Sequence, residues 1–209
     1  MDCFRRLSDA GIIPVVVLSR AEDAVPTAKA LLKGGITVME ITLRTPAALA
    51  AIEAVAAEVP EMLVGAGTVL DVSQCESAAA KGAKFLVSPG FSREMANWCA
   101  ERQIPWIPGC VTPTEIMEAR NAGLEILKFF PANVYGGLKA MKALSAPFRN
   151  VRFIPTGGVN NENIRDFLSA SCVYAVGGSW ICPEKEIQAG NFEGITALCA
   201  SARRCAGLD

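Results

Sequence analysis

The chain has 209 residues, 51% of them hydrophobic, and its 20 basic and 21 acidic side chains give a net charge of −1. This balance, without any basic run, argues against a nucleic-acid partner, because phosphate backbones are bound through clustered Lys and Arg. The first residues contain no apolar core of signal-peptide length, and no stretch approaches the roughly 20 apolar residues of a membrane helix. We therefore expect a cytoplasmic protein with a small-molecule ligand and no membrane partner.

Eight short apolar runs predict strands, and alanine-rich amphipathic stretches between them predict helices. The predicted strands are 12–18, 38–42, 62–66, 84–87, 106–108, 125–129, 151–154 and 173–176. The predicted helices are 23–33, 46–58, 72–81, 93–102, 114–122, 137–144, 161–169 and 191–204. Cap or first-turn signals at Thr45-Pro46, Asp71, Ser92, Thr112-Pro113 and Asn160 start several of them.

This alternation of strand and helix, at a spacing of about twenty residues, predicts a parallel sheet covered by helices. Eight units without a separate second domain favour an α/β fold in the form of one closed (β/α)8 barrel, a TIM barrel, over an open doubly wound sheet. The residues before Ile12 predict one extra helix across the bottom of the barrel. We expect residues 1–209 to form this single domain.

Histidine is absent, and the eight cysteines include no Cys-x-x-Cys spacing. Without histidine the chain lacks the usual general base and the commonest metal ligand, so proton transfer falls to Glu, Asp, Lys, Tyr, Cys or water. Most of the cysteines are expected to be reduced packing residues.

Lys128 is the single charge in the apolar run 126–131, which is typical of a buried strand that ends at a proline. Removing a lysine ammonium from water favours the neutral amine, which can act as a base or form a Schiff base with a carbonyl substrate. The alternative interpretation is that Lys128 extends to the surface or pairs with a carboxylate in the core.

Polar residues follow or close the predicted strands, where the active site of such a barrel is built. Glu40 lies in the second strand, as either a structural partner of Lys128 or the group that moves a proton. Arg44 offers a planar fork of donors suited to a carboxylate, and Thr68 adds a hydroxyl. Without further context, Arg44 could equally form a surface ion pair and Thr68 could cap a helix.

Glycine pairs at Gly157-Gly158 and Gly177-Gly178 follow the seventh and eighth predicted strands. Backbone amides without an intervening Cβ can approach an anion closely, and the loops after these two strands form the recurrent phosphate site of such barrels. Either pair alone is also typical of a tight turn from strand to helix. A carboxylate anchor, a lysine and a phosphate anchor together indicate a phosphorylated 2-keto acid as substrate.

These residues stand in motifs that resemble the 2-keto-3-deoxy-6-phosphogluconate (KDPG) and 4-hydroxy-2-oxoglutarate (KHG) aldolases, in the order of that family and over nearly the whole chain. The motifs are Glu40-Ile41-Thr42-Leu43-Arg44-Thr45, Gly65-Ala66-Gly67-Thr68-Val69-Leu70, Ser88-Pro89-Gly90, Lys128-Phe129-Phe130-Pro131-Ala132, Pro155-Thr156-Gly157-Gly158-Val159 and Gly177-Gly178-Ser179-Trp180.

The resemblance implies a class I aldolase, a homotrimer without metal or cofactor, that cleaves KDPG into pyruvate and glyceraldehyde 3-phosphate in the Entner–Doudoroff route. It also implies cleavage of 4-hydroxy-2-oxoglutarate to pyruvate and glyoxylate. By this resemblance Lys128 forms the Schiff base and Glu40 acts as acid and base. Arg44, Thr68 and Lys128 hold the pyruvate portion, and Pro89 and Phe130 shape the pocket around it. Thr156 meets a substrate hydroxyl, and the phosphate is surrounded by Gly157, Gly158, Gly178 and Ser179.

Two segments depart from the family pattern: Leu18-Ser19-Arg20 is less basic, and Ala132-Asn133-Val134-Tyr135 lacks an acidic residue. They leave the preference for phosphorylated substrates open. The nearest alternative is a 2-dehydro-3-deoxy-6-phosphogalactonate aldolase, which would use the same lysine and glutamate on a stereoisomer. Barrels of the indole-glycerol-phosphate or phosphoribosyl-anthranilate type share the phosphate loops but need no such lysine. A non-catalytic barrel that binds sugar phosphates is the alternative outside enzymes.

Overall fold

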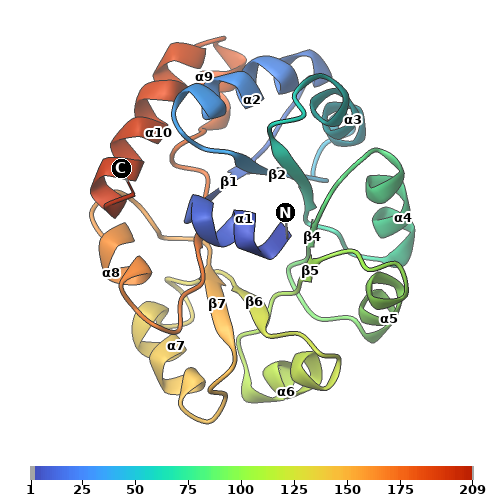
Figure 1. Cartoon of the computed structure of the whole chain (residues 1–209), viewed down its shortest axis with the longest axis vertical. Helices are drawn as coiled ribbons and strands as arrows, with labels where there is room; N and C mark the ends of the chain where they lie inside the picture. Colours follow the sequence, from blue (N-terminus) through green and yellow to red (C-terminus); the bar gives the residue numbers. More distant parts are fainter. Residues whose placement is uncertain (1–2, 209) are drawn as a thin grey trace.

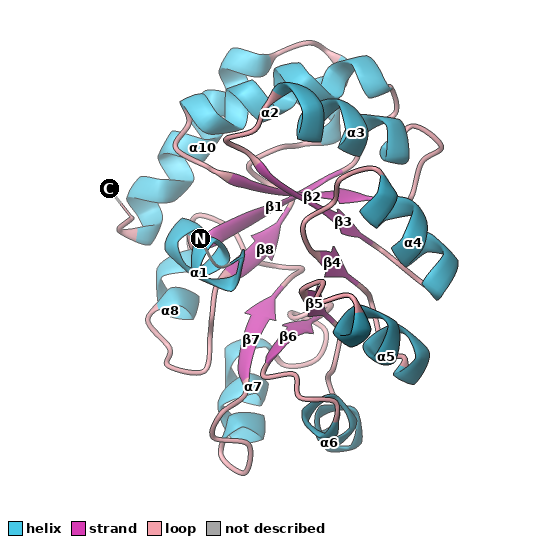
Figure 2. Cartoon of the chain, turned by 45° about the vertical axis from the view of Figure 1, so that its right-hand side comes forward, coloured by secondary structure: helices cyan, strands magenta, loops and turns pink. Residues whose placement is uncertain are grey.

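The structure, a computed structural model, describes residues 3–208, and its parallel strands curl into a barrel ringed by helices (Figures 1 and 2). The strands are β1 (Ile12–Val16), β2 (Val38–Thr42), β3 (Leu63–Gly67), β4 (Leu86–Val87), β5 (Trp106–Ile107), β6 (Ile126–Phe129), β7 (Arg152–Pro155) and β8 (Val176–Gly178). The α-helices are α1 (Cys3–Ala10), α2 (Ala24–Lys33), α3 (Ala48–Glu58), α4 (Val72–Ala80), α5 (Arg93–Glu101), α6 (Pro113–Asn121), α7 (Gly137–Ser145), α8 (Ile164–Leu168), α9 (Glu184–Gln188) and α10 (Phe192–Ala206), and a 3-10 helix covers Ala21–Asp23.

Two ladders of parallel strands make up the barrel wall. Six strands pair in the order β5-β4-β3-β2-β1-β8, and β6 pairs with β7. Isolated parallel bridges join the two sets, from Gly109 to Lys128 on one side and from Thr156 to Gly177 on the other. The barrel predicted from the alternation of apolar runs is therefore confirmed.

Local capping signals account for where several helices begin. Asp71, Ser92 and Thr112 each accept a hydrogen bond from a backbone N–H in the first turn of the following helix. Such caps satisfy amide donors that lack a partner within the helix. The predicted cap at Thr45 is wrong, because α3 follows Ala47 without a side-chain cap, and the Thr45 hydroxyl donates to the carbonyl oxygen of Leu18 at 2.6 Å.

Helix α1 covers the amino-terminal end of the barrel, as predicted for the residues before Ile12 (Figure 1). Its Leu7 is fully buried in a cluster inside the barrel with Ile13, Val38 and Leu63, which come from the first residues of three strands. The larger apolar cluster lies between the strands and the outer helices. Apolar side chains thus fill this end of the barrel, and the polar chemistry is confined to the other.

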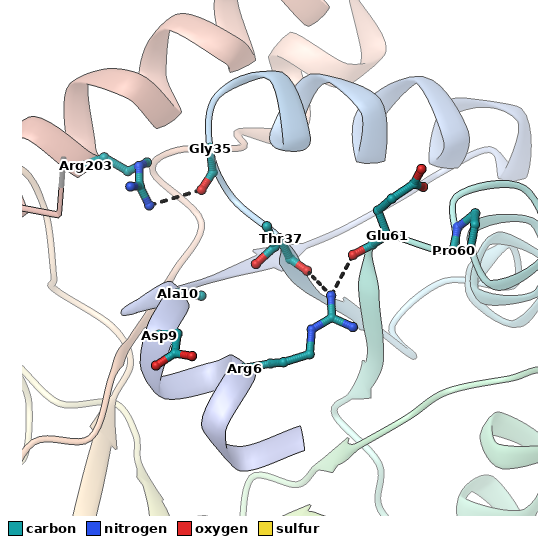
Figure 3. A pocket seen from close by; sticks show the side chains of 8 residues that line it. All are labelled: Arg6, Asp9, Ala10, Gly35, Thr37, Pro60, Glu61 and Arg203. Atoms are coloured by element: carbon teal, nitrogen blue, oxygen red, sulfur yellow. Dashed lines mark hydrogen bonds between the residues drawn. The ribbon is translucent and has the colours of Figure 1, made fainter. Parts of the chain in front are cut away.

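Two arginines fasten the helices at the amino-terminal end (Figure 3). Nη2 of Arg6 donates to the carbonyl oxygens of Thr37 at 3.2 Å and Glu61 at 2.6 Å, and Nη1 of Arg203 donates to that of Gly35 at 3.1 Å. They border a cavity of about 490 Å³ that is also lined by Asp9 and Ala10 of α1. Because these donors bind backbone carbonyls, Arg6 connects α1 to the loops before β2 and β3, and Arg203 connects α10 to the loop after α2.

The eighth strand is the main point where the predicted elements are wrong. Residues 173–176 were expected to form it, with Gly177 and Gly178 following, but β8 is Val176–Gly178. Val173 instead forms a single bridge to Phe153. Glycine has no apolar side chain, so the pattern of apolar residues does not reveal a strand that ends in two glycines. The predicted strand therefore lies too early in the sequence. Helix α9 was not predicted, since it has only five residues.

The cysteines at 75, 99, 110, 172, 182 and 199 are buried thiols rather than half-cystines, in agreement with a packing role. Within residues 3–208, no helix combines the length and the apolar character needed to cross a bilayer.

Candidate active site

Lys128 points into the barrel from β6 and is buried, with 6% of its surface exposed. Its Nζ lies 3.4 Å from Oε1 of Glu40, which is itself 3% exposed. The same Nζ also lies 5.2 Å from the centre of the Phe130 ring. The prediction that Lys128 is buried is confirmed, and the alternative of a side chain extending to the surface is wrong. The pairing with Glu40 is compatible with both a structural and a chemical role.

Arg44 and Thr68 lie together at the carboxyl ends of β2 and β3. Nε of Arg44 donates to Oγ1 of Thr68 at 3.3 Å, so the guanidinium is oriented by a hydroxyl. The alternative reading of Thr68 as a helix cap is wrong, because Asp71 caps α4. Thr68 has a φ of 58°, a left-handed conformation that is unusual for a β-branched residue and recurs at functional sites.

Thr156 and the two glycines after β7 form a sharp turn at the rim of the barrel. Gly157 and Gly158 have φ values of 90° and 86°, a region that favours residues without a Cβ. Asn163 holds this turn, since its Nδ2 donates to the carbonyl oxygen of Gly158 at 2.8 Å. Thr156 bridges to Gly177 of β8, so the two predicted anion-binding segments are neighbours.

A cavity of about 290 Å³ opens between these segments. Its walls include eight of the predicted site residues, namely Arg44, Lys128, Phe130, Thr156, Gly157, Gly158, Gly178 and Ser179. Glu40, Thr68 and Pro89 are not among its lining residues. Glu40 nevertheless contacts Lys128, and Thr68 contacts Arg44, and both of these partners line the cavity.

Pro89 reaches the site less directly, through the loop after β4. The Ser88 hydroxyl donates to the carbonyl oxygen of Gly90 at 2.6 Å and accepts from Nε1 of Trp106 at 3.1 Å. This fixes the loop so that the carbonyl of Pro89 occupies the space where a Cβ on Gly109 would lie. Gly109 is the residue that bridges to Lys128.

Four lining residues were missed by the sequence reasoning: Val15, Val17, Val159 and Trp180. Val15 and Val17 share the inward face at the end of the first strand, so a period of two along that strand could have indicated them. The ring of Trp180 lies where a Cβ on Gly178 would be, and its Nε1 donates to Oδ1 of Asn161 at 2.8 Å. The local sequence does not indicate that Trp180 lines the cavity, because the position of its ring depends on these tertiary contacts.

The arrangement combines an amine, a carboxylate within hydrogen-bonding distance, a guanidinium and glycine-rich backbone around one cavity. The amine can attack a carbonyl carbon, and the carboxylate can exchange protons beside it. The guanidinium suits a carboxylate of the ligand, and the backbone turns suit an anion. Among residues 3–208, no group of three or more Cys, Asp or Glu side chains is placed to hold a metal ion.

Known proteins are similar to this chain in sequence and fold. The KHG/KDPG aldolase of Escherichia coli (strain K12) is 45% identical over 196 residues, which cover 94% of this chain and 92% of the relative. The KDPG aldolase of Legionella pneumophila, solved with pyruvate captured at low pH as a covalent carbinolamine intermediate, has a TM-score of 0.93 and is 42% identical, with 97% of this chain and 98% of that one covered.

A second solved structure is the 2-keto-3-deoxy-6-phosphogluconate aldolase of Zymomonas mobilis ZM4 with 3-phosphoglycerate. It has a TM-score of 0.89 and 39% identity, and the match covers 95% of this chain and 93% of that one. The sequence model described as "KDPG and KHG aldolase" matches residues 4–198. The chain therefore belongs to the KDPG and KHG aldolase family.

Proposed function

We propose that this chain is a class I aldolase that reversibly cleaves 2-dehydro-3-deoxy-6-phosphogluconate to pyruvate and glyceraldehyde 3-phosphate. Cleavage of 4-hydroxy-2-oxoglutarate to pyruvate and glyoxylate is a second reaction of the same site. The observation that carries the proposal is the buried contact of 3.4 Å between Nζ of Lys128 and Glu40 at the wall of the cavity. The similar aldolase from Legionella pneumophila, which holds pyruvate as a covalent carbinolamine, supports it.

In the proposed reaction, neutral Lys128 attacks the C2 carbonyl, and the carbinolamine loses water to give an iminium ion. Glu40, directly or through a water, removes the proton of the C4 hydroxyl, and the C3–C4 bond breaks as its electrons move toward the iminium nitrogen. Glyceraldehyde 3-phosphate leaves, and the remaining enamine takes up a proton at C3 from Glu40, which thus acts as base and then as acid. Hydrolysis then releases pyruvate and regenerates the lysine.

The other predicted residues hold the two ends of the substrate in this proposal. Arg44, oriented by Thr68, binds the carboxylate with a fork of donors. Phe130 and Pro89 shape the pyruvate pocket beside Lys128. Thr156 meets a substrate hydroxyl, and the backbone of Gly157, Gly158, Gly178 and Ser179 surrounds the phosphate. The Zymomonas mobilis structure with 3-phosphoglycerate is in keeping with a phosphorylated ligand.

We further propose that residues 1–209 form one aldolase domain that works without metal or added cofactor, in the cytoplasm and as a homotrimer. The resemblance to the family supports the reaction without a metal and the homotrimer. Large apolar side chains at Leu70, Met117, Val134 and Tyr135 are exposed, which is in keeping with contacts between copies. Light scattering during size-exclusion chromatography measures the number of copies in the assembly directly. Dialysis against a chelator before the assay tests whether activity needs a metal ion.

The central experiment is reduction with borohydride in the presence of pyruvate, followed by mass spectrometry of the intact and digested protein. We expect a stable adduct on Lys128 that is missing from Lys128→Ala. An unmodified wild type, under conditions that label another class I aldolase, would contradict the Schiff base and favour a barrel that only binds sugar phosphates. Rates with the gluconate substrate, its C4 epimer and 4-hydroxy-2-oxoglutarate then decide the substrate preference.

A further inference from the structure

The inward face of β3 carries glycines where the neighbouring strands carry large side chains. Leu63 belongs to the cluster inside the barrel, and alternation along the strand places Gly65 and Gly67 on the same face. The ring of Phe85 fills the space beside Gly65. The carboxylate of Glu40 fills the space beside Gly67, where a Cβ would lie 2.6 Å from both Cγ and Cδ of Glu40 and closer still to Oε1.

The pairing of β2 with β3 explains why the carboxylate lies beside Gly67. Glu40 is directly opposite Gly65, and Thr42 is opposite Gly67. The side chain of Glu40 therefore extends along the barrel toward its carboxyl end, because Phe85 already occupies the nearer glycine position. This direction brings Oε1 to 3.4 Å from Nζ of Lys128 on the opposite wall.

We propose that Gly67 is a positioning residue, whose missing Cβ sets the carboxylate of Glu40 against Lys128 and the reacting carbons. The proposal rests on the proposed function, in which Glu40 moves the proton. Gly67 itself touches neither substrate nor lysine and acts only through Glu40.

The position allows this role to be separated from folding. The φ of Gly67 lies outside the left-handed region, so alanine can adopt its backbone conformation in β3. The atoms that a methyl group would meet are Cγ, Cδ and Oε1 of the Glu40 side chain, and none of them is a backbone atom. Alanine therefore displaces the carboxylate rather than the backbone. Because Glu40 is only 3% exposed, its carboxylate has little room to move and still face Lys128.

The test measures two steps on pyruvate alone, for wild type and for Gly67→Ala. Borohydride trapping reports the imine at Lys128, and uptake of deuterium into the pyruvate methyl group from D2O reports the proton transfer at C3. We expect Gly67→Ala to form the adduct but to exchange about 100-fold more slowly, the loss expected when a catalytic group is misplaced by about 1 Å.

Gly65→Ala is the matched control on the same face of β3, because its methyl group would overlap the ring of Phe85 instead of Glu40. Phe85 belongs to the apolar cluster inside the barrel and has no part in the proposed reaction, so this variant should exchange deuterium within about twofold of wild type, well inside the effect of a misplaced group. Equal slowing in both alanine variants would overturn the proposal, since it would mean that any bulk added to this face of β3 has the same effect.

A double variant tests whether Gly67 acts through Glu40. In a Glu40→Ala background the added methyl group has no carboxylate to displace, so Glu40→Ala/Gly67→Ala should exchange at the rate of Glu40→Ala. If Gly67→Ala itself does not fold, the double variant should recover the melting temperature of Glu40→Ala. A double variant that stays unfolded, or that loses a further 100-fold, would overturn the proposal.

The outcomes also separate this inference from the proposed function. Wild type that forms no adduct overturns the function, and the inference fails with it. Wild type that forms the adduct and exchanges, with Gly67→Ala exchanging equally fast, overturns the inference alone. Slow exchange in Gly67→Ala, with normal trapping and no further loss in the double variant, establishes it.

Discussion

Nζ of Lys128 lies 3.4 Å from Oε1 of Glu40, and the two side chains are only 7% and 4% exposed. They come from β6 and β2, on opposite walls of the barrel, and are separated by 88 positions in the sequence. A buried charge that loses its partner is strongly destabilising, whereas an apolar pair of similar volume is often tolerated.

Replacing one partner of this pair should therefore destabilise the protein more than replacing both. We expect Lys128→Met to lower the free energy of unfolding by about 3–5 kcal/mol, and Lys128→Met/Glu40→Leu to recover most of that loss, as measured by urea denaturation. Lys185→Met is the control, because Lys185 is 81% exposed in its pair with Glu186 and should change stability by less than about 1 kcal/mol. Equal losses in the single and double variants would contradict the prediction.

Leu7 should matter for stability but not for the chemistry. It is fully buried in α1 at the amino-terminal end of the barrel, away from Lys128. Leu7→Ala leaves a cavity, and we expect a loss of about 2–5 kcal/mol in the free energy of unfolding with unchanged borohydride trapping under native conditions. Ser8→Ala, on the exposed side of the same helix, should leave both measurements at wild-type values. A trapping yield that falls with Leu7→Ala would show that the two ends of the barrel are coupled.

Alkaline pH should destabilise the fold through buried thiols. Burial raises the pKa of Cys110 from 9.0 to about 12, with a smaller contribution from the charge of Glu115, and burial also raises the pKa of Cys199 to about 12. The unfolded chain releases these protons at lower pH than the folded one. Their stabilising contribution is thus complete below pH 9 and is lost as the pH rises to 12, by about 1.4 kcal/mol per pH unit for each thiol.

The variant Cys110→Ala checks this, because it removes one of the titrating groups. Its free energy of unfolding should fall less steeply than that of wild type above pH 9 and in parallel with it between pH 7 and 9. Parallel curves across the whole range would contradict a titration of Cys110.

Acid should remove the contribution of Glu115 at the start of α6. Burial acts to raise its pKa, but hydrogen bonds from the backbone amides of Val111 and Thr112, at 2.8 Å each, outweigh burial and hold the pKa below 4.5. A lowered pKa means that the contribution is present above pH 4.5 and disappears as the pH falls. Glu115→Ala should cost about 1 kcal/mol of stability at pH 7 and less at pH 3, as measured by thermal unfolding at both values. A cost that is the same at both pH values would contradict the assignment.

The contact between Glu40 and Lys128 could be predicted because both residues break apolar strands near their carboxyl ends. Parallel strands of a barrel bring such positions to one place, so no distance information was needed. The structure brings Arg44 beside Thr68, and the turn at Gly157 beside β8, at the same end of the barrel.

Other features depended on contacts that no local pattern contains. The apolar run 173–176 ended before the two glycines of β8, because a glycine strand is recognised only by its hydrogen bonds. Trp180 lines the cavity because its ring folds over Gly178 and bonds to Asn161. The role inferred for Gly67 depends on the space that its missing side chain leaves to a residue of another strand.

The backbone of Lys128 also has a structural role, because it bridges to the segment that follows β5. Its own peptide groups join the two ladders there, since its N–H donates to the carbonyl oxygen of Pro108 at 2.8 Å and its carbonyl oxygen accepts from the N–H of Cys110 at 2.9 Å. Separation of β6 from β5 would carry Nζ away from Glu40 while the six-stranded ladder stays paired. On heating, aldol cleavage should thus disappear at a lower temperature than the far-ultraviolet circular dichroism signal.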